Sequence, residues 1–170
     1  MVSVCEALAK MDEAGQREFF FHCCASRRWV EAMVSRSPFS HDDELQEAAR
    51  QAAQDMSEPD WLEAFQGHPM IGDVSTLKER FRKTKAWASQ EQAGTAEAAE
   101  EILAELAELN VKYFERFGFI FIIFATGKTA AEMLCCLIER LGHSRQTEVK
   151  AAAEEQLKIT LLRLTKLPET

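Results

Sequence analysis

Apolar residues recur at helical spacing along most of the chain. Leu45, Ala48, Ala49 and Ala52 follow the i, i+3, i+4, i+7 pattern, which indicates a helix over residues 42–56. A longer stripe begins after Thr95 and extends over about 22 residues, enough for a helix of about 33 Å. Its apolar members are Ile102, Leu103, Leu106, Leu109, Tyr113, Phe114 and Phe117.

Residues that favour helix ends divide the rest of the chain into further helices. Ser, Thr and Asp side chains cap exposed amides at helix starts, and Gly is frequent at helix ends. Thr129 with Glu132 has the spacing of a capping box. The expected helices are 42–56 capped by Ser40, a short one after Ser57 that opens with Glu58 and Pro59 and closes at Gly67, 74–81 after Asp73, 130–141 between Thr129 and Gly142, and one from Ser144 or Thr147 to Leu167.

Two segments interrupt the helical pattern. Residues 67–73 contain two Gly and one Pro and predict a stiff loop. Residues 119–125 are rich in Phe and Ile and favour a strand, but the chain offers no second strand to pair with them. Their backbone groups must therefore form helix-like bonds or face a ligand. We expect an all-α fold: a single compact helical bundle over residues 1–170, with seven to nine helices and one short extended apolar segment.

Charge and cysteine content narrow the class of protein. The 170 residues carry a net charge of −8 and have a pI near 5.1, which argues against a protein that binds nucleic acid or an anionic membrane. This charge does not exclude a small anionic ligand. The five cysteines form no Cys-x-x-Cys pair, so we expect no metal site. The apolar run at 117–125 is too short to span a bilayer, and the first ten residues lack a secretory signal. These features predict a reduced, cytoplasmic protein.

The segment 125–129 superficially resembles a phosphate-binding loop. Its sequence, Ala-Thr-Gly-Lys-Thr, follows an apolar run and precedes a predicted helix. The motif needs a further Gly five positions before Gly127, where this chain has Ile122. A turn followed by a helix cap is the better interpretation, and we expect no nucleotide cofactor.

One of the four histidines differs from the others in its surroundings. His22 is expected to pack on a helix, His41 to be solvated in a first helical turn, and His143 to lie at a helix end. His68 stands between Gly67 and a proline that disfavours the α region for the residue before it. Its imidazole should therefore project from rigid, non-helical backbone, which suits a functional role.

A carboxylate and a guanidinium complete a possible acid–base set. Glu91 follows Trp87 in a polar cluster that is equally typical of a surface helix turn. Arg163 is nearly surrounded by apolar residues, so its charge must either reach water or meet an anion. With His68, these residues suit general acid–base chemistry on a small anion without a metal or cofactor.

Several motifs together resemble one enzyme family over most of the chain, from about residue 19 to 167. Each motif is weak alone, but their order and separation are specific. They are Gly67-His68-Pro69, Ile71-Gly72-Asp73, Trp87 with Glu91-Gln92-Ala93-Gly94, Asn110 to Tyr113, Phe117-Gly118-Phe119, Ala125 to Lys128, and Lys158 to Leu164. In these motifs the chain resembles the 2-oxo-4-hydroxy-4-carboxy-5-ureidoimidazoline (OHCU) decarboxylases, with the Ala-Thr-Gly-Lys version that is similar to bacterial members.

The resemblance implies an all-α enzyme that decarboxylates OHCU to (S)-allantoin in urate breakdown, without a cofactor. It implies His68 as the catalytic acid/base, Glu91 as its assistant and Arg163 as a substrate-binding residue. Glu91 could orient the His68 tautomer or bond to substrate N–H groups, and both roles stay open. A homodimer is also implied. The pocket would be lined by Pro69, by Ala88, Ser89, Gln90 and Gln92, and by main-chain groups of Phe121, Ile122, Ile123, Phe124 and Ala125.

Two positions depart from the family pattern. Ala88 stands where the family commonly has Ser, with Ser89 following it, so one side-chain hydrogen bond to substrate is lost or shifted. His143 stands where the family often has Asn before the last helix. Two alternatives therefore stay beside the decarboxylase: a family member with changed activity, and a non-catalytic helical interaction module in which these residues are ordinary surface and capping groups.

Overall fold

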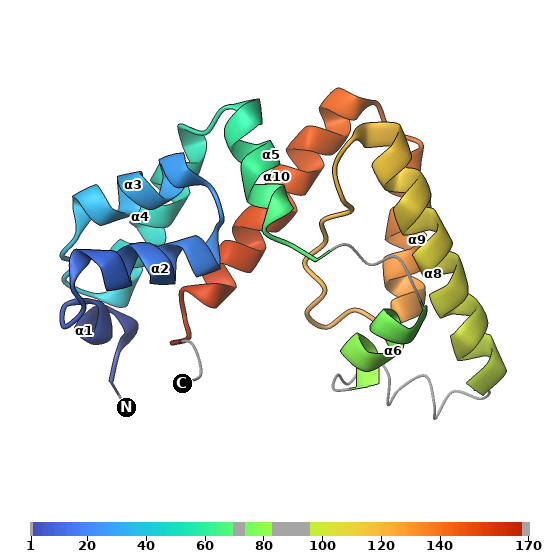
Figure 1. The fold of residues 1–170 in the computed structure, drawn as a ribbon, viewed down its shortest axis with the longest axis horizontal. Helices are drawn as coiled ribbons and strands as arrows, with labels where there is room; N and C mark the ends of the chain where they lie inside the picture. Colours follow the sequence, from blue (N-terminus) through green and yellow to red (C-terminus); the bar gives the residue numbers. More distant parts are fainter. Residues whose placement is uncertain (1, 70–73, 83–95, 168–170) are drawn as a thin grey trace. The chain divides into compact units, whose positions relative to one another are not determined.

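The computed structural model describes residues 2–69, 74–82 and 96–167 (Figure 1). These ranges contain nine helices and no strand, which confirms the predicted all-α class and the expected number of helices. The residues expected to begin two helices, Asp73 and Thr95, lie outside the described residues. The helices are α1 (Val4–Leu8), α2 (Glu13–Cys23), α3 (Arg27–Arg36), α4 (Asp42–Gln54), α5 (Glu58–Gln66), α6 (Val74–Arg82), α8 (Ala96–Phe117), α9 (Ala130–Leu141) and α10 (Arg145–Arg163).

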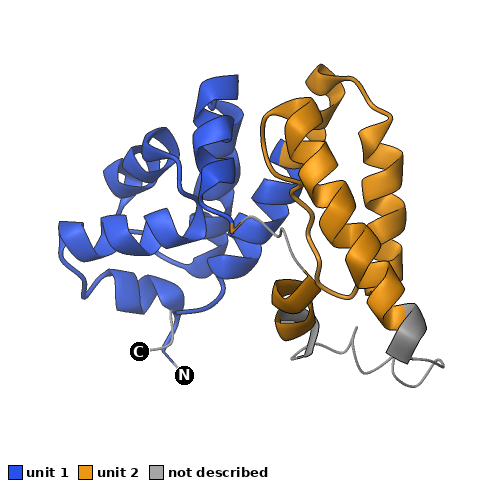
Figure 2. Ribbon diagram, turned by 45° about the vertical axis from the view of Figure 1, so that its right-hand side comes forward, with its two compact units in different colours: residues 1–68, 153–170 blue, residues 69–152 orange. Residues whose placement is uncertain are grey.

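The chain divides into two compact units that share one helix (Figure 2). The first contains residues 1–68 and 153–170, and the second contains residues 69–152. The boundary falls inside α10, which contributes its first half to the second unit and its second half to the first. The expectation of one domain over the whole chain stays a prediction.

The first unit is held together by aromatic and aliphatic side chains from α1 to α5. Phe20 is fully buried and meets the rings of Trp29 and Phe39 edge-on, with centroids 6.0 and 6.3 Å apart. The Trp29 indole nitrogen donates to the Ala49 carbonyl at 3.2 Å, so this polar atom is satisfied inside the core. This packing joins α2, α3 and α4. The carbonyls at the end of α2 in turn accept hydrogen bonds from side chains of α10, as described below.

Most of the predicted helix ends are confirmed. Thr129 and Glu132 form a capping box at the start of α9, and Ser57 and Asp60 form one at the start of α5. Gly142 ends α9, as expected. These signals act within a few residues of one another, and so the sequence alone was sufficient to place them.

Helix α4 starts at Asp42, as predicted, but its cap differs from the prediction and it ends at Gln54 rather than at residue 56. The cap is His41 and not Ser40: the His41 Nδ1 accepts a hydrogen bond from the Glu44 amide at 3.1 Å. Ser40 instead donates its own amide to the Glu44 carboxylate at 2.7 Å. His41 is exposed, as expected, but its ring has a structural role that its residue type did not suggest.

Helix α10 begins where predicted and ends earlier. Ser144, one of the two expected caps, accepts a hydrogen bond from the Thr147 amide at 3.2 Å. The helix ends at Arg163 and not at Leu167. The amides of Thr165 and Lys166 bond three residues back, to the carbonyls of Leu162 and Arg163, which tightens the chain into a turn.

The second unit places the extended apolar segment beside an aromatic cluster. Helices α8 and α9 pack together, and Tyr113 of α8 has its ring 4.6 Å from Phe117, 5.8 Å from Phe119 and 5.4 Å from Phe121. Residues 120–125 belong to neither helix nor strand, as expected for a lone extended segment. One predicted member of the α8 stripe, Phe114, is exposed and does not belong to this core.

Candidate functional site

The imidazole of His68 is held at the end of a helix in the first unit. His68 follows Gly67, the C-cap of α5, and its amide donates to the Phe65 carbonyl at 3.3 Å. The side chain is half-buried, while the next residue, Pro69, is exposed. His68 therefore projects from non-helical backbone, as the Gly-His-Pro sequence predicted.

A buried amide from α10 holds this imidazole. His68 Nε2 lies 2.5 Å from Gln156 Oε1, and Gln156 is 0% exposed. Gln156 Nε2 in turn donates to Thr160 Oγ1 at 3.2 Å. Thr160 is also buried, and its hydroxyl lies 2.9 Å from the Gln156 carbonyl oxygen and 3.4 Å from that of Cys23. The half-buried ring thus joins a chain of buried polar groups.

Arg163 belongs to the same unit as His68 and to the same helix as Gln156. Its Nη1 donates to the His22 carbonyl at 3.1 Å, in the last turn of α2, where a cation also complements the helix dipole. The side chain is half-buried, so its charge meets a backbone carbonyl and does not extend freely into water. A guanidinium has five N–H donors in a planar fork, so this contact leaves capacity for a planar anion. His22 itself is exposed on α2, and the expectation that it packs inside is wrong.

The two thiols beside Arg163 are unsuited to nucleophilic chemistry. Burial raises the pKa of Cys23 to about 12 and that of Cys24 to about 11, although the Arg163 charge lowers both in part. Thiols with such pKa values stay protonated at neutral pH, and the thiolate is the reactive form. Neither thiol therefore supplies a nucleophile to this part of the first unit.

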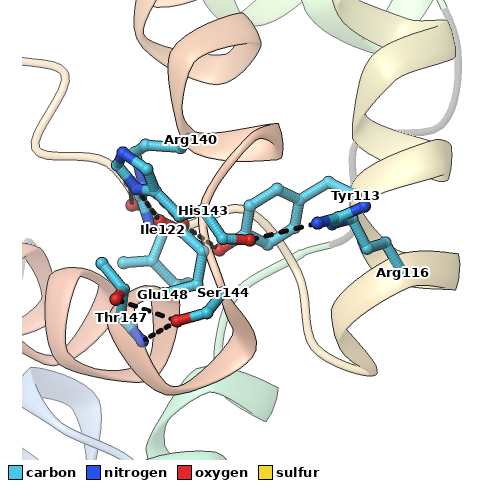
Figure 3. Close-up of polar contacts among 8 residues, drawn as sticks. All are labelled: Tyr113, Arg116, Ile122, Arg140, His143, Ser144, Thr147 and Glu148. Carbon is cyan, nitrogen blue, oxygen red and sulfur yellow. Dashed lines mark hydrogen bonds and ion pairs between the residues drawn. The ribbon is translucent and has the colours of Figure 1, made fainter.

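In the second unit, a buried arginine holds the extended apolar segment (Figure 3). Arg140 of α9 donates from Nη1 to the Ile122 carbonyl at 2.5 Å, and its guanidinium carbon lies 4.6 Å from the centre of the Phe121 ring. Lys128 Nζ reaches the Phe124 carbonyl at 3.2 Å. The segment thus satisfies part of its backbone through side chains, a possibility the sequence reasoning did not consider.

Arg140 is balanced by a fully buried carboxylate, as Figure 3 shows. Glu148 is 0% exposed; its Oε1 accepts from Arg140 Nε at 2.7 Å and from the Tyr113 hydroxyl at 2.5 Å. Its Oε2 lies 2.9 Å from His143 Nδ1. Burial and the bond to Glu148 raise the pKa of Tyr113 well above its usual value. His143, a departure from the family pattern, therefore has a structural partner in this network.

Five of the predicted site residues lie outside the described residues. They are the proposed assistant of His68, Glu91, and its neighbours Ala88, Ser89, Gln90 and Gln92. Phe121 to Ala125 lie in the second unit and His68 and Arg163 in the first. The meeting of all these groups in one pocket stays a prediction.

The polar residues that support His68 and the apolar segment were not predicted from the sequence. One signal was available: Ala152, Gln156, Thr160 and Arg163 are spaced at i, i+4, i+8 and i+11, so they share one face of α10. Polar residues on an otherwise buried helix face require partners. Arg140 and Glu148 gave no comparable signal, because their pairing depends on the turn between two helices.

The described ranges contain neither a candidate metal site nor a helix that could span a membrane. Within residues 2–69, 74–82 and 96–167, no group of three or more His, Cys, Asp or Glu side chains is placed to hold a metal ion. Every helix in those ranges is too short or too polar to cross a bilayer.

Comparison with known proteins identifies the family. The model of the OHCU decarboxylase family matches residues 9–165. The chain belongs to the OHCU decarboxylase family. Among its relatives, the uric acid degradation bifunctional protein TTL of Arabidopsis thaliana is 38% identical over 145 residues, which cover 85% of this chain and 45% of the relative. The chain thus spans less than half of that bifunctional protein. The OHCU decarboxylase of Haloferax volcanii is 31% identical, over 80% of this chain and 79% of the relative.

Solved structures show the same fold. A crystal structure of an OHCU decarboxylase in the presence of (S)-allantoin matches with a TM-score of 0.70 and 38% identity, over 88% of this chain and 96% of that one. A crystal structure of (S)-allantoin synthase matches with a TM-score of 0.67 over 94% of this chain and 52% of that one. Its identity is 22%, so this second likeness concerns the fold alone.

Proposed function

We propose that this member of the OHCU decarboxylase family converts OHCU to (S)-allantoin and CO2. The family match over residues 9–165 and the 38% identity to a decarboxylase crystallised in the presence of (S)-allantoin support this activity. The observation that carries the proposal is the arrangement on α10: a half-buried imidazole held by Gln156, and a half-buried guanidinium seven residues further along the same helix at Arg163.

His68 is the proton-transfer group of the proposed reaction. When the carboxylate leaves as CO2, its bonding electron pair stays on the ring carbon and spreads into the neighbouring C=N and carbonyl system. The nitrogen and the carbon of the former C=N bond must each gain a proton, while the hydroxyl loses its proton and becomes a carbonyl. In total, one proton is taken up for each CO2 released. A single imidazole can polarise the hydroxyl and deliver a proton to one face, which yields one enantiomer, whereas water delivers to both faces.

Arg163 binds the substrate in this proposal. Its planar fork can pair with two acceptors of an anionic or carbonyl edge of the ring. Strong pairing with the departing carboxylate itself would stabilise the ground state and slow the reaction. We therefore expect Arg163 to hold a part of the substrate that persists into the product. Glu91, the residues from Ala88 to Gln92 and the main chain of Phe121 to Ala125 complete the pocket by resemblance to the family.

Optical activity tests the reaction directly. The unstable substrate is generated in situ from urate, and optical rotation is followed with and without the protein. Rapid growth of one allantoin enantiomer is expected; slow racemic formation at the background rate would contradict the proposal. The His68→Ala variant should lose at least about 10²-fold in rate with its helical circular dichroism retained. His41→Asn, which replaces an exposed histidine by another good N-cap residue, is the matched control and should keep the rate.

The resemblance also supports a homodimer and a cytoplasmic location, and both stay proposals. A homodimer predicts a mass about twice the 19.3 kDa of the chain by light scattering, and 19.3 kDa would contradict it. All five cysteines are free thiols, which is compatible with a reducing compartment. Fractionation of the native cells would test the location.

A further inference from the structure

We propose that Gln156 and Thr160 are positioning residues that keep the proton of neutral His68 on Nε2, so that Nδ1 is the basic nitrogen of the ring. The inference rests on the proposed role of His68 as acid/base and goes beyond it, because it assigns the tautomer of the ring and the residues that set it. The orientation of each hydrogen bond is fixed in turn from the protein backbone, through Thr160 and Gln156, to the imidazole.

The Thr160 hydroxyl is the first group whose hydrogen-bond direction is fixed. Its hydroxyl lies 2.9 Å from the Gln156 carbonyl oxygen, one turn back in α10, and 3.4 Å from the Cys23 carbonyl oxygen at the end of α2. Carbonyl oxygens accept and never donate, so the single hydroxyl proton of Thr160 points toward them. The hydroxyl therefore offers only a lone pair to the side-chain amide of Gln156 at 3.2 Å.

The orientation of the Gln156 side-chain amide then determines which of its groups faces His68. Because Thr160 offers a lone pair, Gln156 turns its NH2 group toward Thr160 and its oxygen toward the imidazole. The opposite orientation would set two acceptors against each other in a site where Gln156 is 0% exposed and Thr160 1% exposed. Water cannot compensate for such a mismatch there, so burial locks the amide in one orientation.

An amide oxygen accepts, so the nitrogen that faces it must carry a hydrogen. His68 Nε2 lies 2.5 Å from Gln156 Oε1 and is therefore the protonated nitrogen of the neutral ring. A neutral imidazole has one N–H, which leaves the lone pair on Nδ1. A carboxylate in place of Gln156 would favour the charged imidazolium, whereas the neutral amide accepts the same bond and allows the ring to gain and release a proton.

Nuclear magnetic resonance of the ring nitrogens tests the assignment without relying on activity. The full chain is labelled with 15N-histidine, and the signals of His68 are identified by their loss in His68→Ala. In the wild type we expect a pyrrole-type Nε2 and a pyridine-type Nδ1 at a pH where the ring is neutral. A protonated Nδ1 with a pyridine-type Nε2 would overturn the proposal.

Two substitutions at Thr160 test whether its hydroxyl sets the tautomer of His68 through Gln156. Thr160→Val removes the hydroxyl, frees the Gln156 amide to rotate, and should move both His68 nitrogens toward averaged shifts. A wrong histidine tautomer costs about 10⁴ in kcat in the Ser-His-Asp triad, and a mixture of tautomers should cost less, about tenfold, with KM little changed. Thr160→Ser keeps the hydroxyl and should restore both the spectrum and kcat, which a packing role of the methyl group would not predict.

A matched control uses an exposed threonine just beyond the same helix. The Thr165 hydroxyl bonds to the Leu162 carbonyl at 2.6 Å, so Thr165→Val makes the same chemical change away from Gln156 and should leave the His68 spectrum and kcat unaltered. A wild-type spectrum and kcat in Thr160→Val would overturn the proposal. An inactive wild type that still shows the Nε2–H tautomer, and loses it in Thr160→Val, would refute the decarboxylase function while leaving the positioning roles of Gln156 and Thr160 supported.

Discussion

The buried carboxylate of Glu148 offers the sharpest test of how the second unit is held together. Replacing it by glutamine keeps its size and removes its charge. Glu148 accepts from the Tyr113 hydroxyl at 2.5 Å and from Arg140 Nε at 2.7 Å, and its second oxygen lies 2.9 Å from His143 Nδ1. In Glu148→Gln, the buried Arg140 guanidinium loses its counter-charge, and the new NH2 group faces donors.

The expected cost follows from the burial of both partners. The side chain of Glu148 is 0% exposed and that of Arg140 is 10% exposed, so water can replace little of the lost interaction. Removal of one partner from a buried ion pair typically lowers the free energy of unfolding by about 3–5 kcal/mol. For a chain of this size, each kcal/mol corresponds to about 2–4 °C in Tm.

Chemical denaturation followed by circular dichroism measures this cost. The matched control is Glu108→Gln, which breaks the exposed pair with Lys112, 2.7 Å apart on α8. Exposed helix pairs contribute about 0.3–0.5 kcal/mol, so this variant should remain close to the wild type. A loss below about 1 kcal/mol in Glu148→Gln would refute the view that this carboxylate balances a buried charge. The double variant Arg140→Met, Glu148→Leu should recover part of the loss, because it leaves no charge unpaired.

Four further predictions concern individual residues elsewhere in the fold. Gly67→Ala should lower the free energy of unfolding by about 1–3 kcal/mol, because the added Cβ would lie 2.6 Å from the Ala25 Cβ; an unchanged denaturation midpoint would contradict this packing. Thr129→Ala should cost about 1 kcal/mol through loss of the α9 cap, and Thr129→Ser should restore it. A thiol reagent at pH 8 should label exposed Cys135 in the native protein but Cys23 only on unfolding, since burial raises the pKa of Cys23 from 9.0 to about 12. Stability should accordingly fall as the pH rises from about 9 to about 12, because the unfolded chain releases this proton first.

Much of the helical structure could be predicted from the sequence because its signals are local. The capping box of Thr129 and Glu132 joins residues three positions apart, and the apolar stripe of α8 repeats every three to four residues. The prediction was wrong where two neighbouring residues competed, as at Ser40 and His41, since both can accept from the first turn and backbone geometry decides between them.

The candidate site was only partly predictable. His68 was identified from Gly67 and the proline after it, which act on backbone geometry through adjacent residues. Its partner Gln156 lies 88 residues further along the chain, and nothing near Gln156 in the sequence indicates an imidazole. Gln156 shares one face of α10 with Thr160 and Arg163. That pattern indicates that Gln156 has a polar role, but not which group it contacts.

The sequence by itself determined the all-α class, most helix ends and the family motifs, because those depend on residues a few positions apart or on fixed patterns. Only the tertiary structure decided that Gln156 meets His68 and that Arg140 bonds to both the Ile122 carbonyl and Glu148. A buried polar group must find a partner wherever packing brings one within about 3 Å. That partner is chosen by the fold, and so it cannot be identified from neighbours along the chain.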